Sequence, residues 1–288
     1  MRENRIEGGL RDQKKYRQSL PGSPLVSIIT VVFNGEKSIE RTIRSVIIQS
    51  YQNIEYIIID GGSTDGTLNI IKKYDDKIYY WLSEFDNGIY DAMNKGIRLA
   101  RGELIGIINS DDYYLEGAVE KIVEAAASES EAGVFHADMR IEKANGMSEI
   151  WRSKETLSRS DFYHMPINHP TAFVRASCYE KYGVFDTRYK VAADYDLVVR
   201  YLFDFNVKFR YVKETLAVMR EGGTSCNYSM TTYNDGIEIL SKRDFPLITK
   251  MKFRVWYLWL LFMQFSKRFT LVRHLSFLYN RVKFAERE

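Results

Sequence analysis

Cysteine is scarce in this sequence, and its scarcity excludes several classes of protein. The 288 residues include two cysteines, Cys178 and Cys226, which lie far apart. Their spacing fits neither a zinc site, a redox motif nor a disulfide framework. No run of about 18 or more apolar residues occurs, so no single helix is expected to cross a bilayer. Internal repeats and low-complexity segments are also absent, which favours an ordinary globular protein of a reducing compartment.

Charge of one sign is not in excess either. Lys and Arg number 41 against 38 Asp and Glu, a net charge of +3, which predicts no nucleic-acid partner. Residues 1–23 form a polar, basic leader without the apolar core of a signal peptide, so we expect a cytoplasmic protein. The hydrophobic fraction of 45% is enough to bury a full core, which we expect in a main domain over residues 24–225.

Short apolar runs alternate with helical patterns along the first half of the chain. The run Val26–Val32 is rich in β-branched residues and is typical of a strand buried on both faces of a parallel sheet. Further strands are predicted at 54–59, 78–82, 104–108, 133–137 and 171–175, with a strand pair around Asn145-Gly146. Helices are predicted at 36–47, capped by Asn34, and at 67–74, 90–100, 116–127 and 194–204. This order predicts a doubly wound α/β fold.

Polar residues follow three of these strands, where ligands bind in open α/β sheets. The strand ends carry Phe33-Asn34, Asp60-Gly61-Gly62 and Asn109-Ser110-Asp111-Asp112. Asp60 is able to accept a hydrogen bond from a pyrimidine N–H or a ribose hydroxyl, and the glycines let a ligand approach the backbone. The alternative is a loop closed by Asx turns. Phe33 is a candidate for stacking on a base, or simply for packing.

Asp111 and Asp112 are the strongest indication of a functional site in the sequence. Adjacent carboxylates after a buried strand repel each other unless a cation compensates them. Hard oxygen ligands select Mg²⁺ or Mn²⁺, which would bridge the phosphates of a nucleotide sugar. The alternative is a Ser-Asp-Asp cap for the helix near Glu116.

Two further segments have both a structural and a functional interpretation. Asp194 begins a predicted helix, where a carboxylate serves either as a cap or as a catalytic base. Asp196 lies about 200° further around that helix and should not share the role. Gly222 and Gly223 either fold over phosphates or turn the chain.

Taken together, five segments resemble the family 2 glycosyltransferases, which have the GT-A fold. They are 26–34, 59–67, 87–96, 109–112 and 193–197, and the likeness covers roughly residues 24–225, the expected catalytic domain. The resemblance implies a donor nucleotide bound by Thr30, Phe33, Asn34, Glu36, Asp60, Gly61, Asp91, Asn94 and Asp111. It implies a Mn²⁺ or Mg²⁺ ion on Asp112 and Asp111, a catalytic base at Asp194, and an acceptor or diphosphate region at His169, Gly222 and Gly223. Ala193 stands where many relatives carry Glu.

The same resemblance, to transferases of bacterial polysaccharide and lipopolysaccharide synthesis, implies an inverting reaction. The donor would be a nucleotide-diphosphate sugar, with UDP as the default, and the acceptor a glycan or a lipid-linked sugar. The processive enzymes' Gln-x-x-Arg-Trp motif is missing, which implies non-processive transfer. The alternatives are a non-catalytic binding protein of the same fold and a sugar nucleotidyltransferase. A Rossmann dehydrogenase is disfavoured, because no G-x-G-x-x-G follows the first strand.

The last part of the sequence, within a predicted helical extension over 226–288, is basic and aromatic. Nine Lys/Arg stand against two acidic residues between Lys250 and Glu288, interleaved with Trp and Phe. Such a segment is suited to the interface of an anionic membrane. The alternative is packing on the catalytic domain or on a second subunit.

Overall fold

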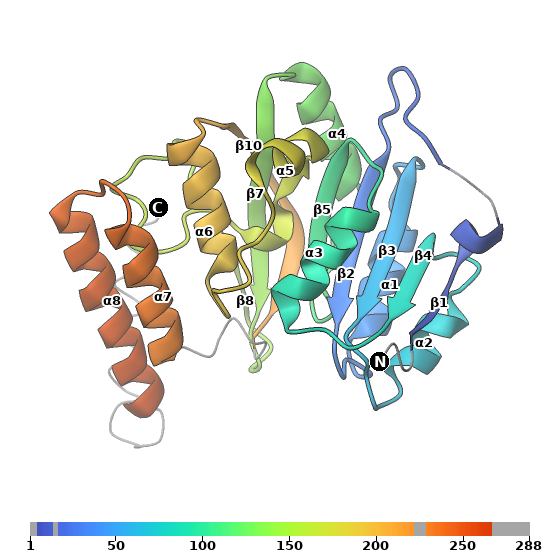
Figure 1. The fold of residues 1–288 in the computed structure, drawn as a ribbon, viewed down its shortest axis with the longest axis horizontal. Helices are drawn as coiled ribbons and strands as arrows, with labels where there is room; N and C mark the ends of the chain where they lie inside the picture. The colour runs from blue at the N-terminus through green and yellow to red at the C-terminus, as the bar shows by residue number, and fades with distance from the viewer. Residues whose placement is uncertain (1–4, 14–16, 222–228, 267–288) are drawn as a thin grey trace. The chain divides into compact units, whose positions relative to one another are not determined.

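The structure, a computed structural model, describes residues 5–13, 17–221 and 229–266 (Figure 1). The chain divides into two compact units, one of residues 1–157 with 166–223, the other of residues 158–165 with 224–288. The domain boundary predicted after residue 225 falls outside the described residues and stays a prediction.

Within the described residues, the first unit is built on one ten-stranded mixed sheet. Its spatial order is β1-β4-β3-β2-β5-β9-β7-β10-β6, with β8 paired to β7. The strands are β1 Ile6–Gly8, β2 Val26–Val32, β3 Ile54–Asp60, β4 Tyr80–Ser83, β5 Leu104–Asn109, β6 Tyr113–Tyr114, β7 Ala132–Glu142, β8 Ser148–Trp151, β9 Phe173–Arg175 and β10 Lys208–Arg220. Strands β4, β3, β2 and β5 are parallel, and their arrows point the same way in Figure 1.

Helices cover both faces of this sheet (Figure 1). They are η1 Leu10–Gln13, α1 Ile39–Ile47, α2 Thr67–Lys73, α3 Ile89–Leu99, α4 Ala118–Ser128, η2 His169–Thr171, α5 Ala176–Tyr182, α6 Ala193–Val199 and the π-helical η3 Arg200–Asp204. Ile28, on one face of β2, belongs to the same core cluster as Ile43 of α1. The next residue, Ile29, faces α3, where a Cβ at Gly96 would lie 2.5 Å from its Cγ2. Because β2 is covered on both sides, every one of its residues is buried and apolar side chains dominate it.

The predicted α/β fold is confirmed, and the differences are local. Helix α1 begins at Ile39 with Ser38 as its N-cap residue, so the prediction of Asn34 as the cap was wrong. Asn34 has a φ of 52°, which only a few residue types adopt readily. The helix predicted at 194–204 is α-helical only to Val199. Strand β10, of 13 residues, was not predicted at all.

The second unit contains two described helices, α7 Met230–Ser241 and α8 Leu247–Ser266. They pack through aromatic side chains: the ring centroids of Tyr233 and Tyr257 lie 5.7 Å apart, and the ring of Phe253 fills the space beside Gly236. In the described part of the chain, no helix has the length and apolar character needed to span a membrane.

His136 of β7 gives the first unit an acid-sensitive core. Its ring is fully buried beside the rings of Phe209 and Tyr211, and neither ring nitrogen has a hydrogen-bond partner among the described residues. Burial lowers the pKa of His136 to about 4, below its ordinary value of 6.5. The unfolded chain therefore binds this proton near pH 6.5, and the folded chain does so only near pH 4.

Protonation of His136 in the unfolded chain should therefore destabilise the folded protein as the pH falls. Between pH 7 and pH 4.5 the free energy of unfolding should fall by about 2.5 kcal/mol from His136 alone. Urea unfolding of the wild type and of His136→Phe at both pH values measures this contribution. The variant should lose about 2.5 kcal/mol less than the wild type, and equal losses would contradict the assignment.

Candidate active site at the carboxyl edge of the sheet

The parallel strands bring the three polar strand ends to one edge of the sheet. Asp60, the last residue of β3, pairs with Val32 of β2, and Asn109 of β5 pairs with Val31. Asp60 and Ser110 therefore flank Val32 at the same level, two strand spacings or roughly 10 Å apart. The residues that follow each strand continue beyond this edge, which makes it the candidate active site.

Asn34 and Glu36 connect the loop after β2 to the loop after β3. The Oδ1 atom of Asn34 accepts a hydrogen bond from the N–H of Thr64 at 2.9 Å, and Ser63 Oγ accepts the N–H of Asn34 at 2.7 Å. Glu36 Oε2 accepts the N–H of Gly66 at 3.2 Å. These contacts fix the position of both loops relative to each other.

Two residues predicted to bind the donor, Thr30 in β2 and Phe33 directly after it, differ in their exposure. Phe33 is 64% exposed, so its ring is available to stack on a ligand. Thr30 is fully buried, and its Oγ1 lies 3.0 Å from the hydroxyl of Tyr56. The predicted contact of Thr30 with the donor stays a prediction.

Asp60 is fully buried at the end of β3 and already accepts several hydrogen bonds. Its Oδ2 atom accepts the N–H of Ser63 at 3.1 Å and the hydroxyl of Ser83 at 2.6 Å, and its Oδ1 atom accepts the hydroxyl of Ser63. The bond to the N–H of Ser63 spans three residues, so it is not an Asx turn, whereas Asp65 Oδ1 accepts the N–H of Thr67 two residues on, with the spacing of an Asx turn. The role of Asp60 toward a nucleotide stays a prediction.

Asp86, which the sequence analysis did not name, lies against Gly61. A Cβ at Gly61 would be 2.4 Å from Asp86 Oδ2, so the carboxylate of Asp86 occupies the space beside Gly61 where the two loops meet. Burial raises the pKa of Asp86, and the charges of Asp91 and Asp60 add to that effect. Asp86 follows the end of β4, so the rule that found the other strand ends would also have found it.

Asp112 is a buried carboxylate in the turn after β5, only 2% exposed. From the described residues its side chain accepts one hydrogen bond, which is weak, with the N–H of Arg220 at 3.4 Å from Oδ1. Burial, and then the charge of Asp111, raise its pKa well above the ordinary value. A nearby cation would relieve this unfavourable charge.

Helix α1 holds the backbone of this turn. Thr42 Oγ1 lies 2.6 Å from the carbonyl oxygen of Asp112 and 2.9 Å from that of Ser110, and Arg41 donates to the carbonyl of Asp111 at 3.1 Å. Strand β6 follows directly, and the N-cap residue of α4 is Gly117. The two aspartates are therefore not the helix cap that the alternative interpretation required.

The two carboxylates fit a divalent cation only together with other ligands. Across the described residues, no group of three or more His, Cys, Asp or Glu side chains is placed to hold a metal ion. Mg²⁺ commonly takes one or two protein carboxylates and completes its shell with water and substrate phosphates. Asp112, buried and poorly compensated, with Asp111 beside it, matches that pattern.

Asp194, at the start of α6, contacts a tyrosine from the same edge of the sheet. Its Oδ1 atom lies 3.0 Å from the hydroxyl of Tyr90 and accepts the N–H of Tyr195 at 2.9 Å. Tyr90 belongs to the first turn of α3, which follows β4. This contact places Asp194 at the carboxyl edge, near the loop that carries Asp86.

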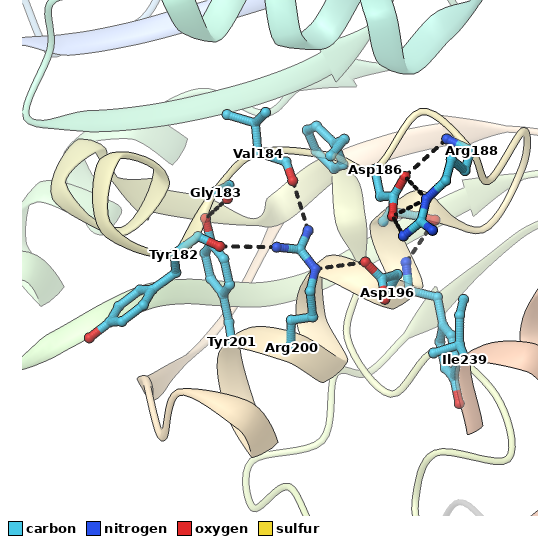
Figure 2. A network of polar contacts seen from close by, with 12 residues as sticks. Tyr182, Gly183, Val184, Asp186, Arg188, Asp196, Arg200, Tyr201 and Ile239 are labelled. Atoms are coloured by element: carbon cyan, nitrogen blue, oxygen red, sulfur yellow. Dashed lines mark hydrogen bonds and ion pairs between the residues drawn. The ribbon is translucent and has the colours of Figure 1, made fainter. Parts of the chain in front are cut away.

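Asp196, predicted not to share the role of Asp194, contacts an arginine of the next helical turn. Figure 2 shows its carboxylate accepting a hydrogen bond from Arg200 Nε at 2.7 Å. Arg200 also donates to the carbonyl of Tyr182 at 3.1 Å and to that of Val184 at 2.7 Å. This network fixes the segment between α5 and α6, and it uses a different carboxylate from the one that contacts Tyr90.

His169 lies close enough to Asp194 for their charges to interact. Burial lowers the pKa of His169, and the charge of Asp194 opposes that shift. The preceding Asn168 anchors this segment to the sheet, because its amide donates to the carbonyls of Ala137 at 3.0 Å and Trp151 at 2.8 Å. Gly222 and Gly223 lie outside the described residues.

Asp91 and Asn94, both predicted to bind the donor, make contacts within the protein. Asp91 Oδ2 accepts the N–H of Asn87 at 3.0 Å and lies 3.8 Å from Lys95 Nζ. Asn94 is buried, and its amide donates to the carbonyl of Phe185 at 2.9 Å and accepts the N–H of Phe185 at 3.0 Å. Their binding to the donor stays a prediction.

Comparisons with known proteins concern the family and the fold of this chain. Residues 27–183 match the sequence profile described as Glycosyl transferase family 2. An uncharacterized glycosyltransferase of Mycobacterium tuberculosis is 33% identical over 188 residues, which are 63% of this chain and 70% of the relative.

Solved structures of glycosyltransferases share the fold. Staphylococcus aureus TarS 1–349 in complex with UDP-GlcNAc is similar at a TM-score of 0.61 and 20% identity, over 81% of this chain and 71% of that one. The match to TarS spans 43% of the longer TarS chain. The mannosyltransferase PcManGT of Pyrobaculum calidifontis, in complex with GDP-Man and Mn²⁺, is similar at a TM-score of 0.56 and 16% identity, over 94% of this chain and 81% of that one. These neighbours confirm the predicted GT-A fold.

Proposed function

Because this chain belongs to glycosyl transferase family 2 and is a glycosyltransferase, we propose that it is an inverting, metal-dependent and non-processive one. It moves a sugar from a nucleotide diphosphate, by default UDP, to a glycan or lipid-linked acceptor in cell-surface polysaccharide synthesis. The observation that carries this proposal is the placement of Asp60, Asp86, Asp112 and Asp194 around one edge of the sheet. The neighbours' complexes with UDP-GlcNAc and GDP-Man support the class of donor.

Asp194 is the proposed base. It removes the proton of an acceptor hydroxyl while that oxygen attacks the anomeric carbon from the face opposite the diphosphate. The bond to the diphosphate breaks as the new one forms, so a single displacement inverts the configuration. Among the described residues, no hydrogen bond reaches Asp194 Oδ2, which leaves this atom for the acceptor.

Donor binding is assigned to the loops after β2, β3 and β5. Exposed Phe33 stacks on the base, and Gly61, with Asp86 against it, belongs to the loop after β3 that contacts the nucleotide. Asp112 and Asp111 would hold the Mn²⁺ or Mg²⁺ ion, which would supply positive charge to the departing diphosphate. His169, beside Asp194, faces the acceptor region.

A thermal-shift panel of nucleotide sugars, with and without Mn²⁺, tests this function. A donor at a hundred times its Kd stabilises the folded state by about 2.7 kcal/mol, which should raise the Tm by about 5–10 °C. We expect a UDP-sugar to produce this shift in Mn²⁺ and a smaller shift in a chelator. No shift with any nucleotide sugar, with Mn²⁺ or Mg²⁺ present, would contradict the proposal.

We further propose that helix α8 binds the cytoplasmic face of an anionic membrane, near a lipid-linked acceptor. Six large apolar residues lie exposed along one side of the helix, within about 100° of arc, and we call them the apolar stripe. They are Leu247, Ile248, Met251, Val255, Leu258 and Phe262. The opposite side, with Phe253 and Tyr257, packs on α7.

The charges of α8 support an anionic lipid as the occupant of this stripe. The helix contains Lys250, Lys252 and Arg254 and no acidic residue. Lys252 lies on one flank of the stripe and Arg254 on the other, where long cationic side chains reach lipid headgroups.

Two acidic substitutions in the stripe should weaken this binding. In co-sedimentation with phosphatidylcholine–phosphatidylglycerol vesicles, Val255→Glu with Leu258→Glu should weaken binding at least about ten-fold, and Arg254→Gln about five-fold. Ile48→Glu is the control: Ile48, the C-cap residue of α1, is equally exposed at 66%, and the variant should bind as the wild type. Absence of vesicle binding by the full chain would overturn the proposal. So would a stripe variant that loses stability or changes oligomeric state, because the stripe would then be covered by this chain or by a second copy.

A further inference from the structure

Two side chains one turn apart on α3 reach the segment that carries Asp194. The hydroxyl of Tyr90 lies 2.7 Å from the carbonyl oxygen of Val191 and 3.0 Å from Asp194 Oδ1. The amide of Asn94 forms two hydrogen bonds with the backbone of Phe185, at 2.9 and 3.0 Å. Both side chains are buried, with exposures of 8% and 5%. Helix α3 thus holds both ends of the segment from Phe185 to Asp194.

The contact of Tyr90 orients one oxygen of the carboxylate, and no described residue forms a hydrogen bond with the other. Asp194 Oδ1 accepts the N–H of Tyr195 at 2.9 Å and shares the single hydroxyl proton of Tyr90, at 3.0 Å, with the carbonyl oxygen of Val191, at 2.7 Å. The ring of Tyr90 is itself fixed by stacking on Phe185, at a centroid distance of 5.5 Å and an interplanar angle of 29°. Burial, and next the charge of Asp194, raise the pKa of Tyr90 well above its ordinary value, so the phenol keeps its proton and remains a donor.

We propose that Tyr90 is a positioning residue, which orients Asp194 so that Oδ2 faces the acceptor hydroxyl. The inference rests on the proposed function, since Tyr90 acts through the proposed base. In the transfer step the acceptor's proton moves to Asp194 Oδ2, while Tyr90 retains its own proton and donates only a hydrogen bond. Orientation of this kind matters because a displacement of about 1 Å can cost a reaction about 100-fold in rate.

Tyr90→Phe removes the hydroxyl and keeps the ring. We expect kcat to fall about 10- to 100-fold, with the donor's KM and the Kd of UDP changed less than about two-fold. Tyr79→Phe is the matched control. Tyr79 is also buried, at 2% exposure, but its hydroxyl has no hydrogen-bond partner within the part of the chain that the structure describes. Its kcat should equal that of the wild type.

A double variant separates positioning from a general structural effect. If Tyr90 acts through Asp194, adding Tyr90→Phe to Asp194→Asn should cause no further loss of kcat, whereas independent effects would multiply. Suppose that Tyr90→Phe keeps the wild-type kcat while Asp194→Asn is inactive. This result would overturn the inference and leave the proposed function intact. A full multiplicative loss in the double variant, or weaker UDP binding by Tyr90→Phe, would also overturn it. Full turnover by Asp194→Asn would overturn the proposed base and this inference together.

Discussion

Asp194→Asn should lower kcat by about 10²- to 10⁴-fold while leaving nucleotide binding unchanged. The amide has almost the same shape as the carboxylate but cannot take the proton of the acceptor hydroxyl, and general base catalysis is worth about this factor. Asp194 contacts Tyr90 and Tyr195 and lies outside the loops assigned to the donor. Turnover with a UDP-sugar and an acceptor, together with the Kd of UDP, measures both parts of the expectation.

Asp196→Asn is the matched control for this variant, with the same substitution two residues further on. Asp196 forms an ion pair with Arg200 at 2.7 Å and is only 3% exposed, so its loss should lower the Tm. The kcat of the folded variant should stay near that of the wild type. If Asp196→Asn rather than Asp194→Asn removed turnover, the base would be wrongly assigned.

Asp112→Ala should abolish metal-dependent binding of the donor. The metal's contribution to binding and charge neutralisation is worth several kcal/mol, on the order of a 10²- to 10³-fold change in Kd. In Mn²⁺ the variant should therefore bind a UDP-sugar no better than the wild type does in a chelator. Isothermal titration in Mn²⁺ and in chelator compares the two proteins directly.

The control for this variant is a carboxylate far from the carboxyl edge. Asp76 is exposed beyond the end of α2, and Asp76→Ala should bind the donor as the wild type does. Equal donor affinity of the wild type with and without metal would contradict the role given to Asp112.

The sequence predicted the centre of the fold well because the physical signal there is local. Strand β2 is buried on both faces, so its residues form one apolar run that is visible without any knowledge of its neighbours. The strand-end rule then located Asp60 and Asp112, because parallel strands must end at the same edge. Asp86 follows the end of β4 and therefore obeys the same strand-end rule, although it was not predicted.

Strand β10 was not predicted because charged residues interrupt its apolar residues. It begins with the alternation of Lys208, Phe209, Arg210 and Tyr211, and its buried residues are Leu216, Ala217 and Val218. That alternation is typical of a half-exposed strand and was the available signal. The N-cap error at Asn34 has a different cause, since the side chain bonds to Thr64 across a loop rather than to the helix that follows.

The roles of Tyr90 and Asn94 depend on contacts that no local pattern contains. Their partners, Asp194 and Phe185, lie about a hundred residues further along the chain. The motif containing both residues suggested a donor site by resemblance, whereas their contacts in the structure point to the segment of the base. Only the folded chain brings these groups together.

A crystal structure of the full chain with UDP and Mn²⁺ tests most directly whether one edge of the sheet forms the active site. We predict the metal bonded to Asp112, the uracil between Phe33 and Asp60, and Asp194 facing the space beyond the diphosphate. A nucleotide bound elsewhere on the protein, or a metal that does not contact Asp112, would contradict this account.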